Sequence, residues 1–300
     1  MRFRMSGFIS LLLSGWLMVT TAHAADYVET PMMLIGSLYP VPAVLTLPDA
    51  ATPAPAVVML HGTASDKNEV GNLYQRLARS LAERGIASLR IDFAGGGESP
   101  VSYRLYTLSS AVADSEAALA YLADLDGIDD GRLALVGFSQ GGLIAQLVAQ
   151  RNPEIKAMAL WSSVAGNGRG NFSALFEKYY DEAVKNGFAR VHFAWRPPLE
   201  FSQQWFDEVE ANTSLSDMIS YRGALLAVAG RDDTSVPYQA SEKLLQAAGS
   251  QDKTLRILDG ANHIFNVLDA NGLAEDQQLP DTLLTLTSDW LEDRLSSVSH

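Results

Sequence analysis

From residue 56 onward, short aliphatic runs alternate with longer amphipathic segments, and this alternation restricts the chain to few folds. It is typical of a mostly parallel sheet flanked by helices, and it excludes all-α and all-β folds. The expected strands are 56–60, 87–91, 133–137, 157–161, 224–229 and 255–258. The expected helices are 68–83, 108–125, 141–149, 238–248 and 279–295. Segments 32–37 and 41–47 resemble an antiparallel hairpin in front of this pattern.

The first residues are typical of a targeting segment. Arg2 and Arg4 precede an apolar run over 8–19, which is followed by the A-x-A pattern of Ala22 to Ala24. The run is short for a membrane span, so cleavage after Ala24 is expected rather than a retained anchor. The sequence therefore predicts a signal peptide over 1–24, one catalytic domain over 25–300 and export, with the periplasm favoured over full secretion.

Charge and cysteine content exclude several classes of function. Cleavage would remove two arginines and no acidic residue, so the formal charge of −13 would become −15. Such an acidic surface repels phosphate backbones and anionic lipid, which argues against nucleic acid and stable membrane association. The chain has no cysteine, hence no disulfide, no thiolate metal site, no cysteine nucleophile and no cysteine that could carry a lipid. The oligomeric state is left open.

One region interrupts the alternation. From about 166 to 222 the distance to the next strand exceeds a normal crossover, so we expect an insertion. It is dense in aromatic residues: Phe172, Phe176, Tyr179, Tyr180, Phe188, Phe193, Trp195, Phe201, Trp205 and Phe206. These residues could form a small helical core of their own, or they could belong to a lid that lines a pocket for an apolar or aromatic group. Both interpretations can hold for different residues.

Residues 137–141 have the sequence G-F-S-Q-G, between an expected strand and an expected helix. This is the context that a G-x-S-x-G nucleophile turn requires, because the glycines allow a strained serine to expose its hydroxyl. Ser139 is therefore the candidate nucleophile. An incidental serine in a glycine-rich turn is the alternative interpretation.

A serine hydroxyl needs a base, and in this architecture acid and histidine follow the serine in that order. His23 lies in the expected signal peptide, His61 and His192 precede the acid position, and His300 is terminal, which leaves His263. For the acid, Asp232 and Asp233 lie together in the loop after the strand 224–229. The physics of the sequence alone does not choose between them.

The developing oxyanion needs two backbone N–H donors. Gln140, directly after the nucleophile, is expected to supply one. Thr63, in the loop that follows the strand 56–60, is expected to supply the other. Alternatively, His61 and Gly62 only shape a tight turn, and a neighbour of Thr63 donates.

Taken together, these segments resemble the α/β-hydrolase superfamily, and within it the small cinnamoyl and feruloyl esterases and related carboxylesterases. The similarity rests on residues 61–63, 92–99, 137–141, 230–237 and 262–265. It implies an α/β-hydrolase fold with a helical lid insertion, and it points to Asp233 as the catalytic acid. The sequence departs from the family pattern at Thr63, Ala64 and Ala94.

The expected function is that of a serine hydrolase cleaving a small-molecule carboxylic ester through Ser139, His263 and Asp233, by way of an acyl-enzyme. No cofactor or metal is expected, because the five histidines show no metal-ligand spacing. Two alternatives are a peptidase or amidase with the same triad and a binding protein that has lost catalysis. No element of the triad is missing, which disfavours the binding protein.

Overall fold

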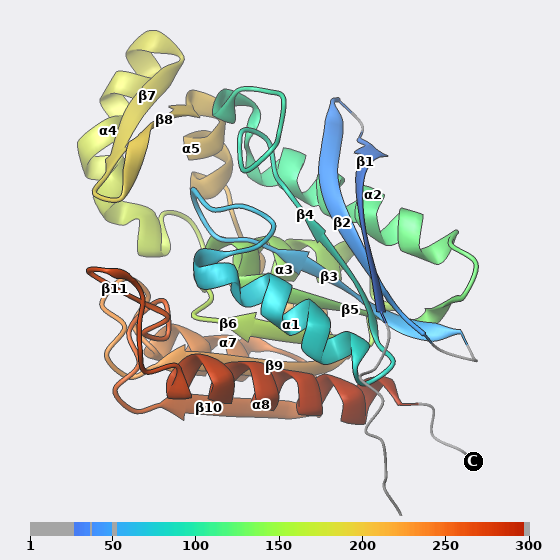
Figure 1. Ribbon diagram of the computed structural model, residues 1–300. Coiled ribbons are helices and arrows are strands. Elements are labelled where there is room, and N and C mark those ends of the chain that lie inside the picture. Colours follow the sequence, from blue (N-terminus) through green and yellow to red (C-terminus); the bar gives the residue numbers. More distant parts are fainter. Residues whose placement is uncertain (1–26, 37, 50–52, 297–300) are drawn as a thin grey trace, which may run out of the picture.

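The computed structural model describes residues 27–36, 38–49 and 53–296, so the expected signal peptide over 1–24 lies outside the described residues. Within them, eight strands form one sheet in the order β1-β2-β4-β3-β5-β6-β9-β10 (Figure 1). β2 is antiparallel to β1 and β4, and the remaining neighbours are parallel. This architecture confirms the predicted fold class. The strands are β1 (Tyr27–Ile35), β2 (Pro40–Pro48), β3 (Ala54–Leu60), β4 (Ala87–Ile91), β5 (Ile128–Phe138), β6 (Ala157–Trp161), β9 (Ala224–Gly230) and β10 (Lys253–Leu258).

Helices cover both faces of the sheet. α1 (Leu73–Ala82) and α8 (Gln278–Leu295) lie on one face, and α2 (Leu108–Ala123), α3 (Gln140–Arg151) and α7 (Gln239–Ala247) lie on the other (Figure 1). In β5, Leu133 and Leu135 join one core while Ala134 and Val136 join the other. Successive side chains point to opposite faces, so a strand covered on both sides is apolar throughout.

The first expected helix starts later than the sequence pattern suggests. Residues 68–72 form a loop and a short 3₁₀ turn (Val70–Asn72) before α1 begins at Leu73. Glu69 and Asn72 have φ of 59° and 57°, which is the left-handed region and is incompatible with a helix. This loop leaves Glu69 available for the site described below.

The insertion lies between β6 and β9, on the upper left of Figure 1. Its helices agree with the expectation of a helical lid, but the sequence analysis missed a hairpin of two strands. In β7, Ala189 and Val191 are buried while Arg190 and His192 are exposed, an alternation too short to stand out in the sequence. The elements are a 3₁₀ turn (Gly170–Phe172), α4 (Ser173–Asn186), β7 (Phe188–Phe193), β8 (Arg196–Ser202), α5 (Gln203–Glu210), α6 (Ser214–Asp217) and a 3₁₀ turn (Met218–Ser220).

Most aromatic residues of the insertion pack on each other. The ring of Trp205 lies 4.8 Å from that of Phe201 and 4.9 Å from that of Phe206, both edge-to-face, and all three side chains are fully buried. These are favourable aromatic geometries, so the interpretation as a local core holds for this group. Trp195, in the turn of the hairpin, is instead 72% exposed, and its ring lies 5.1 Å from the partly buried Phe193.

Two short strands, β11 (Leu268–Asp269) and β12 (Gly272–Leu273), precede α8. Among the described helices, none combines the length and the apolar character that crossing a membrane requires.

Candidate active site

Ser139 occupies a strained turn between β5 and α3. Its φ of 54° and ψ of −118° lie outside the regions that residues with a side chain prefer, at a cost of about 1–3 kcal/mol. Two backbone bonds fix the turn, since Ser139 N donates to Trp161 O at 2.9 Å and Val164 N donates to Ser139 O at 3.0 Å. A Cβ on Gly141 would lie 2.0 Å from Leu60 O, so only glycine fits there.

The structure brings Ser139, His263 and Asp233 into one chain of contacts. Ser139 Oγ lies 3.1 Å from His263 Nε2, and His263 Nδ1 lies 2.7 Å from Asp233 Oδ2. The three residues follow β5, β10 and β9, whose carboxyl ends meet at the same edge of the sheet. A carboxylate can only accept, so Nδ1 carries a proton and Nε2 is free to accept the serine proton.

Asp233 is held firmly in this arrangement. Its side chain is fully buried, and its second oxygen accepts the backbone N–H groups of Ser235 and Val236, each at 2.8 Å. Asp232 is exposed, and its own N–H donates to Ala261 O. Of the two adjacent aspartates, Asp233 is the one that contacts His263.

The loop that carries His263 is shaped by its neighbours. Asn262 Oδ1 accepts the N–H groups of Ile264 and Asn266, and Phe265, at φ 54°, is fully buried. The ring of Phe138 lies 5.1 Å from that of His263. The residue just before Ser139 therefore packs against His263, a contact the sequence analysis missed.

Thr63 and Gln140 also lie beside Ser139. A Cβ on Gly62 would be 3.3 Å from Ser139 Cβ, and Thr63 Oγ1 donates to Gln140 Oε1 at 2.6 Å. Among the described residues, no hydrogen bond occupies the backbone N–H of Thr63 or of Gln140. Both amides are therefore available as hydrogen-bond donors.

A hydrogen bond to its carbonyl oxygen fixes the orientation of the Gly62–Thr63 peptide. His61 Nδ1 lies 2.8 Å from Gly62 O, and Phe93 N donates to His61 Nε2 at 3.1 Å, so the ring nitrogen that faces Gly62 carries the proton. In a trans peptide the C=O and N–H groups point in opposite directions. Fixing the carbonyl of Gly62 therefore aims the N–H of Thr63.

Buried carboxylates hold the same loop, and the sequence analysis did not identify them. Glu69 accepts from Gly62 N at 2.7 Å and from Ser65 Oγ at 2.7 Å. Asp92 pairs with the Lys67 ammonium at 2.6 Å and accepts Lys67 N at 2.7 Å. Glu69 lay in an expected helix, and only contacts between distant segments reveal its role.

The other histidines and the possible metal sites are accounted for within the described residues. His61 is buried with both ring nitrogens bonded, and His192 is exposed on β7. In the part of the chain that the structure describes, no group of three or more His, Cys, Asp or Glu side chains is arranged to hold a metal ion.

Comparison with known sequences identifies relatives. The family described as serine aminopeptidase S33 matches residues 51–220, a segment that contains Ser139 but ends before Asp233 and His263. An uncharacterized protein of Mycobacterium tuberculosis is 27% identical over 209 residues, covering 70% of this chain and 63% of that protein. The chain thus spans less than two thirds of the length of that relative.

Solved structures share the fold. Est1E of Butyrivibrio proteoclasticus with bound ferulic acid has a TM-score of 0.65 and 21% identity, over 87% of this chain and 96% of that one. The dienelactone hydrolase of Anabaena variabilis has a TM-score of 0.63 and 17% identity, over 91% of this chain and 100% of that one. At these identities the similarity shows a common architecture.

Proposed function

The chain belongs to the hydrolase family described as serine aminopeptidase S33, and on this premise we propose that it is a serine hydrolase that cleaves carboxylic esters. The observation that carries the proposal is the continuous contact from Asp233 through His263 to Ser139. This order of acid, base and nucleophile is what acyl transfer through a serine requires. Of the three proposed catalytic residues, the family match contains only Ser139. The proposed roles of Asp233 and His263 therefore rest on this geometry.

In the proposed mechanism, Ser139 Oγ attacks the ester carbonyl while His263 Nε2 takes its proton. The N–H groups of Thr63 and Gln140 stabilise the negative charge that develops on the carbonyl oxygen. His263 then protonates the departing alcohol, which leaves an acyl group on Ser139. Water, deprotonated by His263, releases the acid and restores the hydroxyl.

The family description makes aminopeptidase activity a second candidate. An aminopeptidase needs an acceptor for the ammonium group of its substrate, for which a free carboxylate is best suited. The buried carboxylates beside the site are already engaged: Glu69 by Gly62 and Ser65, Asp92 by Lys67, and Asp233 by His263. This engagement favours an ester without a charged amine.

An aromatic acyl group is the preferred substrate class in this proposal. Within the described insertion, Trp195 is the one exposed aromatic residue, whereas Tyr180, Phe188 and Phe193 are partly buried. The exposed face of the Trp195 ring is available for stacking. The fold is shared with a protein whose structure contains ferulic acid, an aromatic acid. Both observations support hydroxycinnamate esters as the first compounds to assay.

The experiment compares the chain from Ala25 onward with Ser139→Ala on p-nitrophenyl esters, methyl hydroxycinnamates and alanine p-nitroanilides, free and N-acetylated. We expect ester turnover by the wild type and a loss of at least about a thousandfold in Ser139→Ala. Activity in Ser139→Ala within about tenfold of the wild type would reject the proposal. Faster cleavage of free alanine p-nitroanilide than of any ester would assign the aminopeptidase function instead.

A further inference from the structure

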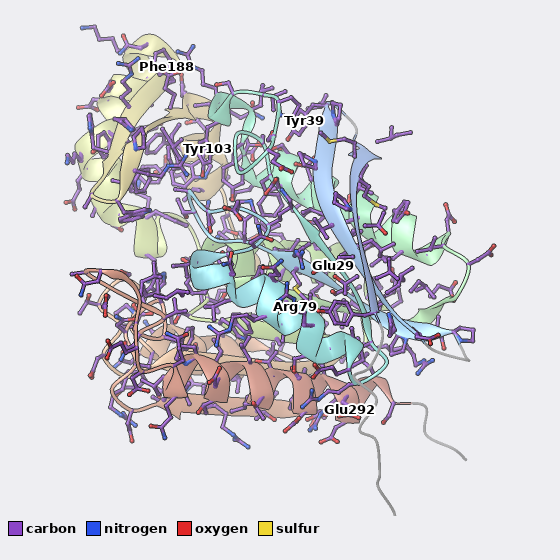
Figure 2. The ribbon with its side chains drawn as sticks, in the orientation of Figure 1. Glu29, Tyr39, Arg79, Tyr103, Phe188 and Glu292 are labelled. Atoms are coloured by element: carbon purple, nitrogen blue, oxygen red, sulfur yellow. The ribbon has the colours of Figure 1, made fainter. Side chains whose placement is uncertain are left out.

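The insertion docks on the segment that precedes α2 through a continuous set of contacts. The ring of Tyr103 lies 4.9 Å from that of Phe201 in β8, and the Arg104 guanidinium lies 3.5 Å from the centre of the Phe188 ring in β7. Arg104 also pairs with Glu200 at 2.7 Å. Figure 2 labels Tyr103 and Phe188 on the two sides of this contact. The hairpin is therefore held against the body of the protein rather than suspended above it.

At the start of β8, Arg196 reaches the loop that follows β3 and carries Thr63, residues 61–65, which we call the oxyanion loop. Its Nη1 donates to the carbonyl of Ala64, the residue directly after Thr63. Ala64 is buried and has a φ of 63°, a left-handed conformation that residues with a Cβ adopt at a cost of about 1 kcal/mol or more. Such a conformation persists only where surrounding contacts hold it.

Tyr103 lies near the same residue, on the body of the protein. Burial raises the pKa of Tyr103, and the backbone of Ala64 and the charge of Arg196 oppose that rise, which places all three groups in mutual range. Ala64 thus lies near Tyr103 and accepts a hydrogen bond from Arg196 of the insertion.

The guanidinium of the partly buried Arg196 has fewer hydrogen-bond partners than it can use. Among the described residues, no carboxylate lies within ion-pair distance of it, and its Nε is buried without a hydrogen-bond partner. An arginine with an incompletely satisfied head group is costly to bury. Stability alone does not account for this placement, whereas a function at the loop it contacts does.

We infer that Arg196 is a positioning residue that fixes the oxyanion loop from the insertion, so that the hairpin β7–β8 completes the catalytic site. This inference rests on the proposed function. By holding the carbonyl of Ala64, Arg196 fixes the Ala64–Ser65 peptide, two peptides beyond the one that carries the Thr63 N–H. It thereby restrains the loop that keeps this N–H aimed at the oxyanion. His61 and Glu69 also restrain the loop, so loss of Arg196 weakens the donor without removing it.

The test uses Arg196→Met, which keeps the aliphatic stem, and Arg196→Lys, which restores a donor. With active sites titrated by a fluorophosphonate, we expect kcat of Arg196→Met to fall about tenfold with KM within about twofold, less than the loss of a whole oxyanion donor. The inhibition constant of a trifluoromethyl ketone, which forms a tetrahedral oxyanion on Ser139, should rise by about the same factor. Arg196→Lys should recover most of both.

The matched control is Arg190→Met in the same hairpin, where Arg190 is exposed and pairs with Glu200. Its kcat and ketone binding should equal those of the wild type. If Arg196→Met does not fold, Arg196→Gln replaces it in the same comparison. A kcat per titrated site within about twofold of the wild type, or a loss equal to that of Arg190→Met, would overturn the inference. Wild-type ester activity that disappears in Ser139→Ala keeps the proposed function intact in that case.

Discussion

Asp233 Oδ2 lies 2.7 Å from Nδ1 of His263, and the two residues are 30 positions apart in the chain. They meet because β9 and β10 are parallel neighbours whose following loops lie at the same edge of the sheet. Asp232, one residue earlier, points into solvent. A shift of one residue in this loop would therefore exchange an orienting carboxylate for an exposed one.

This difference predicts opposite results for two identical substitutions. Asp233→Asn should lower kcat about a thousandfold to ten-thousandfold, because an amide no longer holds the required tautomer of His263 or stabilises its charge. Asp232→Asn should stay within about twofold of the wild type. Both are measured per titrated active site. The reverse pattern would transfer the role to Asp232.

Trp195 should affect substrate choice rather than stability. Because its side chain is 72% exposed, Trp195→Ala removes little buried surface. We expect KM for methyl hydroxycinnamates to rise about three- to tenfold, as the loss of one aromatic contact implies, with p-nitrophenyl acetate unchanged. Val184→Ala, at another exposed apolar position of the insertion, is the control. An equal effect on both esters would contradict the proposed contact.

The ion pair between Lys67 and Asp92 should contribute more to the free energy of unfolding than an exposed pair of the same length. Lys67 Nζ lies 2.6 Å from Asp92, whose side chain is fully buried, so Asp92→Asn leaves the buried ammonium with only Glu98, 2.9 Å away and 73% exposed, as its carboxylate partner. We expect the free energy of unfolding in urea to fall by about 3 kcal/mol.

Asp289→Asn is the matched control for that change. It breaks the Arg84–Asp289 pair, also 2.6 Å long, but the Asp289 side chain is 58% exposed. Its loss should be below about 1 kcal/mol. Equal losses in the two variants would show that burial does not set the strength of the Lys67 pair.

Asp114 predicts a pH dependence of stability. It lies in α2, is buried, and accepts a hydrogen bond from Tyr39 Oη at 3.0 Å (Tyr39 is labelled in Figure 2). Tyr106 is a second neutral tyrosine near it. Burial raises the pKa of Asp114 from 3.8 to about 7, and the bond from Tyr39 opposes this rise. Between these two values the unfolded chain binds fewer protons than the native one, so this carboxyl lowers stability as pH rises.

The measurement is the unfolding midpoint from pH 5 to pH 8, where the carboxyl contributes a loss of ~1.4 kcal/mol per pH unit up to its native pKa. Asp114→Asn should be more stable than the wild type at pH 8 and should show a smaller fall across this range. Tyr39→Phe, which removes the donor to the carboxylate and so raises the native pKa of Asp114 further, should extend the fall to higher pH. Parallel curves for the wild type and Asp114→Asn would refute the prediction.

The strands and the strained turn at Ser139 could be predicted from the sequence for a physical reason. β4 and β6 are covered on both faces, so each appears as an unbroken apolar run with the predicted ends, 87–91 and 157–161. The turn at Ser139 requires glycines at fixed positions, so its local pattern identifies it. His263 remained by elimination among five histidines.

The hairpin β7–β8 and the residues that support the oxyanion loop could not be predicted in the same way. β7 has only six residues, and its alternation is buried against the insertion rather than against the sheet. Glu69 follows an apparent helical pattern, and its left-handed backbone is imposed by bonds to Gly62 and Ser65. No local signal distinguishes such residues from surface charges.

The sequence by itself thus determined the sheet, the turn that exposes Ser139 and the identity of its histidine partner, because each depends on short-range periodicity or on the conformational freedom of glycine. Only the tertiary structure put Asp233 rather than Asp232 in contact with His263, joined Thr63 to Gln140 and brought Arg196 of the insertion to Ala64. Those relationships depend on which loops the packed sheet brings together. A contact between residues far apart in the chain becomes specific only when the surrounding core has fixed the backbone on both sides of it.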